Sequence, residues 1–317
     1  MFKYVKILWG MLTDENIWWR YITVTPMIKW MPDRIYLKKR YKFKMHKELN
    51  IKNPQTFTEK LQWLKLYDRN PLYTKMADKY EVKQYIKNVL GEDYVIPIVG
   101  GPWKHFSEID FDKLPNQFVL KNTHDSGGVI ICNDKDAFNK EEAWKKLEYS
   151  LKHNYFYYNR EWPYKNIEPR IIAEQYMEEL GRGSLLDYKL HCFNGKVKVI
   201  LVCLDRDDEN GIKKVFYDHD WNKLDLRRPN ISNDSDIERP VHLCKMIEFA
   251  ERLSRNIPFV RVDFYDINGK LFFGEMTFFP SGGMVGFVPE KWDKILGGYL
   301  TLSSYPYNKG AESESKK

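Results

Sequence analysis

The chain has 317 residues, of which 43% are hydrophobic and 30% are charged, and its formal net charge is +7 at pH 7. This is the composition of a globular protein with one large or two to three small domains, and its modest positive charge excludes nucleic acid as an expected partner. Four cysteines without CxxC spacing and seven scattered histidines argue against a zinc site and predict reduced thiols in a cytoplasmic protein.

Residues 1–55 are predicted to form a basic helical segment. Its first apolar stretch is short and is interrupted by Lys3 and Lys6, so it fits neither a secretory signal nor a membrane span. Residues 34–47 interleave basic and aromatic side chains. Two interpretations remain open for them: a solvated face, or peripheral contact with an acidic polymer or the inner face of a membrane.

Residues 56–115 are predicted to be mainly helical and to lie on the substrate side. Thr56 and Glu59 have capping-box spacing at the start of a helix in "TFTEKLQWLKLYD". A second helix is predicted over "YTKMADKYEVKQYIKNVLG", carrying Lys79 and ending at Gly91. A strand and a loop are predicted in "YVIPIVGG".

Strands dominate from residue 116 onward. A small subdomain over 116–180 is predicted from the strands "QFVLKNT", "GGVIICN" and "RIIAEQYM" with the helix "AFNKEEAWKKLEYSL". A second subdomain over 181–306 contains the strands "LLDYKLHCFN" and "KVKVILVCLDR", the helix "PVHLCKMIEFAERLSRN" and a hairpin that turns at "DING". Residues 307–317 are predicted to be disordered. Helices and strands segregate along the chain, which favours an α+β fold.

The hairpin "RVDFYDINGKLFFGEMTFFP" places Asp263 and Glu275 on two otherwise apolar strands. Side chains alternate along paired strands, so both carboxylates can point to the same face. Two carboxylates buried together require a cation between them. That cation is either Arg261, in a structural ion pair, or a divalent ion such as Mg²⁺, which needs a phosphate site nearby.

A phosphate site is predicted in "FVLKNTHDSGGVII". The chain lacks both GxxxxGK[ST] and a GxGxxG between a strand and a helix. It does place Lys121 at the end of a strand, beside a turn formed by Ser126, Gly127 and Gly128. A lysine in this position can contact a phosphate while the amides of the turn cover it. His124 is interpreted as a loop residue near the substrate.

The order of five segments resembles the ATP-grasp superfamily: "FTEKLQWLKLYDRNPLYTKMADKY", "FVLKNTHDSGG", "RIIAEQYM", "DYKLHCFNGK" and "RVDFYDINGKLFFGEMTF". Within it, the chain is most similar to the TupA-like family, which is named for a teichuronopeptide biosynthesis protein and is found in surface-polysaccharide gene sets. The resemblance covers roughly residues 50–300. It implies an ATP-grasp fold, in which two α+β subdomains clasp ATP, preceded here by the basic helical segment.

The resemblance also implies a role for individual residues. Lys79 and Lys121 would contact phosphates under a mobile cover made by Ser126, Gly127 and Gly128. Glu174, with the backbone from Gln175 to Met177, would form the adenine edge, and Asp187 would bind the ribose. Asp263, Glu275 and Thr277 would hold Mg²⁺, while Arg261 and Lys189 would act on the transferring phosphoryl group. Thr277 departs from the pattern, because many members of the superfamily have Asn at this position.

The function implied by the resemblance is an ATP- and Mg²⁺-dependent carboxylate–amine ligase that acts through an acyl phosphate. Its partners would be an acid, such as a uronic acid of a surface glycan, and an amine. The alternative is a glycosyltransferase that uses a nucleotide sugar, since D-x-D triplets occur at 205–207, 218–220 and 234–236. Of these, only the first is predicted to end a strand. A non-catalytic scaffold is disfavoured, because every charged position of the site is occupied.

Overall fold

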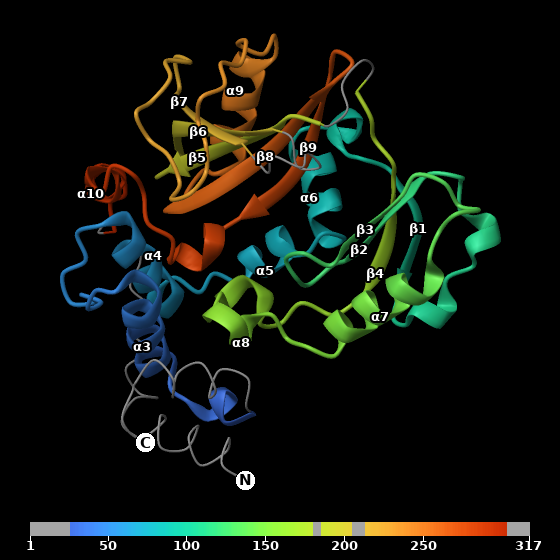
Figure 1. Cartoon of the computed structure of the whole chain (residues 1–317), viewed down its shortest axis with the longest axis horizontal. Coiled ribbons are helices and arrows are strands. Elements are labelled where there is room, and N and C mark those ends of the chain that lie inside the picture. The colour runs from blue at the N-terminus through green and yellow to red at the C-terminus, as the bar shows by residue number, and fades with distance from the viewer. Residues whose placement is uncertain (1–25, 180–184, 205–212, 303–317) are drawn as a thin grey trace.

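The computed structural model describes residues 26–179, 185–204 and 213–302, which form two antiparallel sheets with helices between and around them (Figure 1). The predicted α+β class is therefore confirmed. The N-terminal stretch 1–25 and the predicted disordered tail 307–317 lie outside the described residues. No helix within the described ranges is both long enough and apolar enough to cross a membrane.

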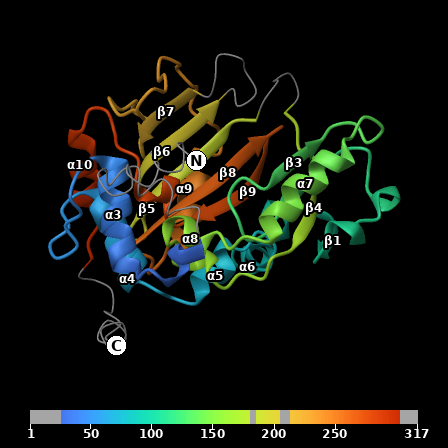
Figure 2. The ribbon, with the colours of Figure 1, turned by 60° about the horizontal axis from the view of Figure 1, so that its bottom comes forward.

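The smaller sheet has four strands in the order β1-β4-β2-β3. They are β1 (Ile98–Trp103), β2 (Phe118–Asn122), β3 (Val129–Cys132) and β4 (Ile171–Gln175), all paired antiparallel. Helix α7 (Lys140–Leu151) covers one face, where Ala143 and Leu147 join an apolar cluster with Phe118 and Leu120 (Figure 2). Strand β1 precedes residue 116, so this sheet begins earlier in the chain than the predicted small subdomain.

The larger sheet has five strands in the order β7-β6-β5-β8-β9. They are β5 (Asp187–Phe193), β6 (Lys196–Leu204), β7 (Lys213–Asp218), β8 (Phe259–Ile267) and β9 (Lys270–Thr277). Helix α9 (Leu243–Leu253) packs on one face through Met246, Phe249 and Ala250, which belong to the largest apolar cluster. The opposite face carries the charged residues described below.

The hairpin of β8 and β9 forms as the sequence predicts. Asn268 and Gly269 have φ values of 49° and 75°, the conformation that a tight two-residue hairpin turn requires. The register shifts between the pairs Val262–Met276 and Phe264–Phe273. Asp263 therefore lies opposite two residues, Gly274 and Glu275, at a β-bulge. Bulges redirect side chains, and this one lies where the two acids meet.

The helices near the N-terminus precede both sheets in the chain. They are α3 (Asp33–Met45), α4 (Phe57–Tyr67), α5 (Leu72–Ala77) and α6 (Glu81–Val89), and the later helices are α8 (Phe156–Asn159) and α10 (Lys291–Tyr299). The predicted capping box is present at the start of α4, where Thr56 and Glu59 bond reciprocally. In Figure 1, α5 and α6 lie between the two sheets.

The prediction of a single helix over residues 73–91 is wrong, because the structure has two helices there, α5 and α6, separated by residues 78–80. The carboxylate of Asp78 accepts the backbone N–H of Tyr80 at 2.8 Å and pairs with Arg170 at 2.7 Å. A carboxylate used in this way starts a new helix rather than continuing the old one. Lys79 therefore lies in a turn rather than on a helix. Gly91 follows α6 with a φ of 113°, as expected for the residue that ends it.

Candidate functional site

A cleft of about 150 Å³ lies between the two sheets and is lined by six of the predicted site residues. Its walls come from the turn before α6, from α6 itself, and from strands of both sheets. The lining residues are Lys79, Val82, Lys83, Lys121, Val129, Glu174, Asp187, Lys189, Tyr265, Phe273, Gly274 and Glu275. Six predicted residues from five distant parts of the sequence thus meet in one place. We call this space the inter-sheet cleft.

On the small-sheet side, Glu174 lies between two lysines. Its Oε1 is 2.7 Å from Lys83 Nζ, and its Oε2 accepts a hydrogen bond from Lys121 Nζ. Burial alone would raise the pKa of Glu174, but the charges of Lys121 and Lys83 overcome this effect and lower the pKa to about 2. Burial lowers the pKa of Lys83 more than Glu174 raises it. The carboxylate is therefore held firmly ionised by this arrangement.

Lys83 was missed by the sequence reasoning. Its Nζ also donates to the carbonyl of Ile96 at 2.8 Å, which ties α6 to the segment that enters β1. The one sequence signal that could have pointed to Lys83 as a site residue was its position four residues after Lys79, in a segment already assigned to the site. A lysine on an amphipathic helix, however, looks the same in sequence whether it faces solvent or a cleft.

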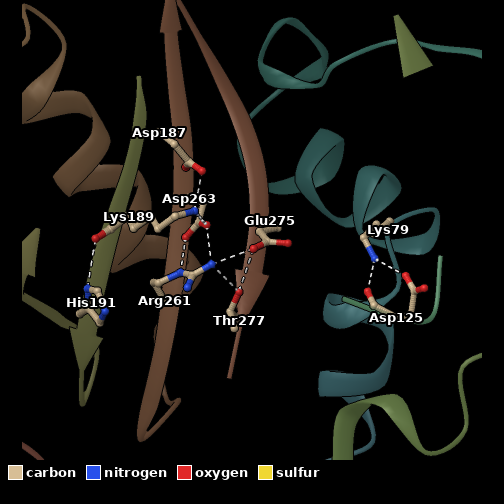
Figure 3. Close-up of polar contacts among 9 residues, drawn as sticks. All are labelled: Lys79, Asp125, Asp187, Lys189, His191, Arg261, Asp263, Glu275 and Thr277. Carbon is tan, nitrogen blue, oxygen red and sulfur yellow. Dashed lines mark hydrogen bonds and ion pairs between the residues drawn. The ribbon is translucent and has the colours of Figure 1, made fainter. Parts of the chain in front are cut away.

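Lys79 contacts Asp125, the residue that precedes the glycine turn (Figure 3). Lys79 Nζ donates to the carbonyl of Asn122 at 3.0 Å and to that of Asp125, and lies 3.5 Å from the Asp125 carboxylate. Ser126 and Gly127 are exposed at the tip, and Gly127 has a φ of 104°. The structure thus brings the predicted phosphate lysine to the predicted cover loop.

On the large-sheet side, Arg261 bridges the two hairpin acids (Figure 3). Its Nε and Nη2 each donate to Asp263 at 2.7 Å, and Nη2 also donates to Glu275 at 2.7 Å and to Thr277 Oγ1 at 3.0 Å. Lys189 Nζ pairs with Asp263 and lies 2.6 Å from Asp187. The ion pair with Arg261, one of the two alternatives for these acids, is therefore present.

Comparison of the sequence with models of protein families identifies the family to which the chain belongs. A family model described as TupA-like ATPgrasp matches residues 59–301. The chain belongs to the TupA-like ATP-grasp family. The two sheets are accordingly the two α+β subdomains of an ATP-grasp fold, as predicted. A comparison with curated protein sequences gave no match.

Solved ATP-grasp structures resemble the chain at low identity. D-alanine–D-alanine ligase from Bacillus anthracis complexed with ATP is 16% identical with a TM-score of 0.38, over 64% of this chain and 54% of that one. D-alanine–D-alanine ligase from Helicobacter pylori is 13% identical with a TM-score of 0.36, over 71% and 61%. N5-carboxyaminoimidazole synthase from Aspergillus clavatus, in complex with ADP and 5-aminoimidazole ribonucleotide, is 13% identical with a TM-score of 0.38, over 64% and 44%. The match thus spans about half the length of these chains.

The donor set of this ATP-grasp protein fits Mg²⁺ only as part of a larger shell. Asp263, Glu275 and Thr277 offer hard oxygen atoms on one face of the hairpin, which are the donors that Mg²⁺ prefers. Within the described ranges, no group of three or more acidic, histidine or cysteine side chains is arranged to hold a metal. Mg²⁺ commonly binds through one or two carboxylates, with water and phosphate completing six ligands. The residues therefore fit that mode of binding.

The predicted adenine edge of the ATP-grasp site is only partly assembled. Glu174 lines the cleft, but Gln175 and Met177 do not. The backbone N–H of Gln175 already donates to the carbonyl of Pro97 at 2.9 Å. The apolar surface in the cleft comes instead from Val82, Val129 and Phe273, which were not singled out in the sequence.

Three further candidates have structural accounts. His124 is buried with Nε2 3.1 Å from the carbonyl of Ser150, and burial lowers its pKa, so it joins the glycine turn to α7 rather than facing the cleft. Asp218 ends β7, contrary to the expectation that only the first D-x-D triplet ends a strand, and its carboxylate accepts the N–H groups of its own turn. Asp236 forms an exposed pair with Lys223. The triplet at 205–207 lies outside the described residues.

Proposed function

We propose that this ATP-grasp protein is an ATP- and Mg²⁺-dependent carboxylate–amine ligase that acts through an acyl phosphate. The observation that carries the proposal is the inter-sheet cleft, where Lys121 of the small sheet and Lys79 and Lys83 of the α6 region face Glu275 of the larger sheet, which shares Arg261 with Asp263. This arrangement suits phosphoryl transfer, because catalysis there depends on positioning and on neutralising phosphate charge.

Binding of ATP is supported by the charges and by the apolar walls of the cleft. Lys79, Lys83 and Lys121 supply cationic donors for phosphates, and Val129 and Phe273 supply apolar surface for a purine. The cleft volume of about 150 Å³ is smaller than the 300–1,000 Å³ typical of small-molecule sites. Nucleotide entry therefore requires the sheets to separate and ion pairs such as Lys121–Glu174 to exchange partners.

Mg²⁺ held by Asp263 and Glu275 would neutralise negative charge on the phosphates. The other tasks fall to residues of the chain. Release of Glu275 by Arg261 would leave the Arg261 guanidinium free to bind oxygens of the transferring phosphoryl group, in concert with Lys189. The glycine turn would exclude water, which otherwise hydrolyses an acyl phosphate.

The reaction that this geometry supports has two steps. A carboxylate oxygen of the acid substrate attacks the γ-phosphorus, and the bond to the β-phosphate oxygen breaks, which gives an acyl phosphate and ADP. An amine then attacks the acyl carbon, phosphate leaves with its bonding electron pair, and the nitrogen loses a proton. No side-chain nucleophile is needed, which agrees with the absence of GxSxG from the sequence.

We propose that the acid belongs to a surface or capsular polysaccharide, which is supported by the family to which the chain belongs. The exposed side of α3 is compatible with an acidic glycan or the inner face of a membrane. It carries five exposed basic residues and few acids: Arg34, Lys38, Lys39, Lys42 and Lys44. A glycosyltransferase, the alternative from the sequence, gains no support, because Asp218 and Asp236 are explained by the turn and the ion pair described above.

Two measurements test the proposal. ATP with Mg²⁺ should raise the melting temperature, and Asp263→Asn or Glu275→Gln should abolish the Mg²⁺-dependent part, while the exposed control Asp236→Asn should leave it unchanged. ADP release should require both an acid and an amine, and hydroxylamine in place of the amine should trap the acyl phosphate as a hydroxamate. Stabilisation by a sugar nucleotide but not by ATP, or ADP release with an alcohol acceptor alone, would disprove the ligase assignment.

A further inference from the structure

A second cavity, of about 240 Å³, adjoins the inter-sheet cleft on the face of the larger sheet. Lys189 lines both spaces, and Arg261, which lines the second cavity, binds Glu275 of the cleft. His191 lies opposite Arg261 in the register of β5 and β8, and its Nδ1 lies 3.1 Å from the carbonyl oxygen of Lys189 (Figure 3). The cavity therefore opens at the end of the cleft where phosphoryl transfer is proposed. We call it the Arg228 pocket.

The charged lining of this pocket is entirely cationic in the part of the chain that the structure describes. It consists of Lys189, Lys214, Arg228 and Arg261, and no carboxylate lines it. Lys189 and Arg261 are balanced by the acids of the neighbouring cleft. Lys214 and Arg228 form no ion pair among the described residues, and the one acid whose charge reaches Arg228 is Asp293, which does not line the pocket. Arg228 is buried and Lys214 is half-buried, and cations withdrawn from water without an ion pair are costly, so the pocket is prepared for an anion.

The neighbours of Arg228 fix its position but do not neutralise it. Its Nη1 donates to the carbonyls of Val285 at 2.8 Å and Gly286 at 3.3 Å, and its guanidinium lies 4.2 Å from the centre of the Phe287 ring. Burial, followed by the charge of Arg261, lowers the pKa of Arg228 to about 10. The guanidinium is thus charged at neutral pH and held in place by neutral groups, without an ion pair among the described residues.

The other groups of the pocket contribute to the same positive field. Burial lowers the pKa of Lys214, and the charges of Arg228, Lys189 and Arg261 add to that effect. Burial also lowers the pKa of His191 well below its usual range, so the imidazole adds no charge of its own. An anion in the pocket would relieve the repulsion among these cations.

We propose that the Arg228 pocket binds a second anionic group of the acid substrate. In this proposal, which rests on the ligase function, Lys189 and Arg261 meet the carboxylate to be activated. Lys214 and Arg228 hold another carboxylate or a phosphate of the same molecule. The substrate class is therefore an acid with at least two negative groups. The pocket volume suits one monomer-sized unit, so a longer chain would enter by its end.

The proposal is tested by calorimetric titration of three probes: glucuronate, glucarate, which has a second carboxylate, and glucuronate 1-phosphate. At least one doubly anionic probe should bind about tenfold or more tightly than glucuronate, the effect of one added hydrogen bond between charged groups. Whichever binds more tightly identifies the second group as a carboxylate or a phosphate. Equal affinities, or no detectable binding of any probe, would overturn the proposal.

Lys214→Met is the decisive variant, because Lys214 has no side-chain partner among the described residues whose loss would disturb the fold. It should reduce the preference for the doubly anionic probe to within about threefold. Lys198→Met, which removes an exposed charge from the same sheet outside the pocket, should leave the preference intact. A preference that survives Lys214→Met would place the second anion elsewhere and would also overturn the proposal.

The titrations are repeated with ADP and Mg²⁺ present, so that the two proposals can fail separately. Probe binding should persist with ADP bound, whereas competition would place the probe in the inter-sheet cleft and overturn the pocket assignment. The melting temperature of the same samples with ADP and Mg²⁺ reports on the nucleotide site alone. A normal nucleotide response without discrimination between the probes refutes only the pocket.

Discussion

Replacing Glu174 by glutamine removes the charge that holds two lysines at the small-sheet wall of the cleft. Glu174 is buried, and both of its oxygens are used, by Lys83 and by Lys121. Glutamine has nearly the same shape but can neither neutralise two ammonium groups nor accept from both equally well. We expect Glu174→Gln to lower the free energy of unfolding by about 3 kcal/mol at pH 7.

The magnitude follows from the pKa of Glu174, which falls from the usual 4.5 to about 2. At about 1.36 kcal/mol for each unit of pKa, this fall corresponds to a preference for the ionised form of about 3 kcal/mol. Burial of Lys83 opposes the pairing and reduces the net value. The variant also leaves Lys83 buried without its counterion, which destabilises the folded variant further. Breaking a buried ion pair costs about 3–5 kcal/mol, so this effect offsets most of the reduction caused by the burial of Lys83.

The pH dependence has a definite sign. The pKa of Glu174 is lower in the folded state than in the unfolded state. Its contribution to the free energy of unfolding is therefore complete at pH values above the unfolded-state pKa, and it is lost as the pH falls through the folded-state pKa. The stability difference between wild type and variant should therefore be about 3 kcal/mol at pH 7, begin to decline below about pH 4.5, and fall to roughly half by pH 3.

Urea denaturation of both proteins at these three pH values measures the difference. Glu168→Gln is the matched control, because Glu168 forms an exposed pair with Lys104 at 3.3 Å and should cost less than about 1 kcal/mol at any pH. A loss below 1 kcal/mol at pH 7 for Glu174→Gln, or a loss that grows as the pH falls, would refute the reasoning.

Two further changes test the loop and the N-terminal surface. A Cβ at Gly128 would lie 2.3 Å from Asp125 Oδ2, so Gly128→Ala should displace Asp125 from Lys79 and lower the free energy of unfolding by about 1–3 kcal/mol in chemical denaturation. The control Gly298→Ala, whose Cβ would meet nothing within 4 Å, should be neutral or stabilising. Equal effects of the two substitutions would contradict the contact. Lys38→Glu with Lys39→Glu on α3 should weaken sedimentation with anionic vesicles by about tenfold or more. The control pair Lys145→Glu with Lys146→Glu on α7 should not weaken sedimentation with the vesicles. Equal losses for the two pairs would show that vesicle binding depends on the overall charge of the protein rather than on α3.

The parts of the fold that the sequence predicted are those with local causes. The hairpin turn depends on Asn268 and Gly269, whose positive φ values are favoured by the residues themselves. The start of α4 depends on Thr56 and Glu59, three residues apart. Neither feature needs a distant partner, so the local sequence contains the whole physical reason for it.

The errors arise where a distant residue decides. The break after α5 is fixed by the pairing of Asp78 with Arg170, which is 92 residues away. The cleft position of Lys83 is fixed by Glu174 on β4, and the early start of the small sheet by the pairing of β1 with that same strand. A propensity or a periodicity describes neighbours along the chain, so it cannot report these contacts.

The site residues were identified from the sequence as an ordered set rather than singly, and their individual roles stay predictions. The resemblance named Lys79, Lys121, Glu174, Asp187 and Glu275, and all of them line one cleft. It did not name Lys214 or Arg228, whose proximity depends on how the loops after β7 and β9 fold back across the larger sheet.

The balance of charge shows why the cleft and the Arg228 pocket suit different ligands. The network around the cleft contains five cations and five carboxylates: Lys79, Lys83, Lys121, Lys189 and Arg261, with Asp125, Glu174, Asp187, Asp263 and Glu275. A balanced network accepts a nucleotide most easily together with its metal ion. The cationic side chains can then exchange their carboxylate partners for phosphates, and the carboxylates can exchange their cationic partners for the metal. Among the described residues that line these two spaces, Lys214 and Arg228 form no ion pair, and both line the adjoining pocket. An acid that brings no metal of its own therefore finds its counter-charge there.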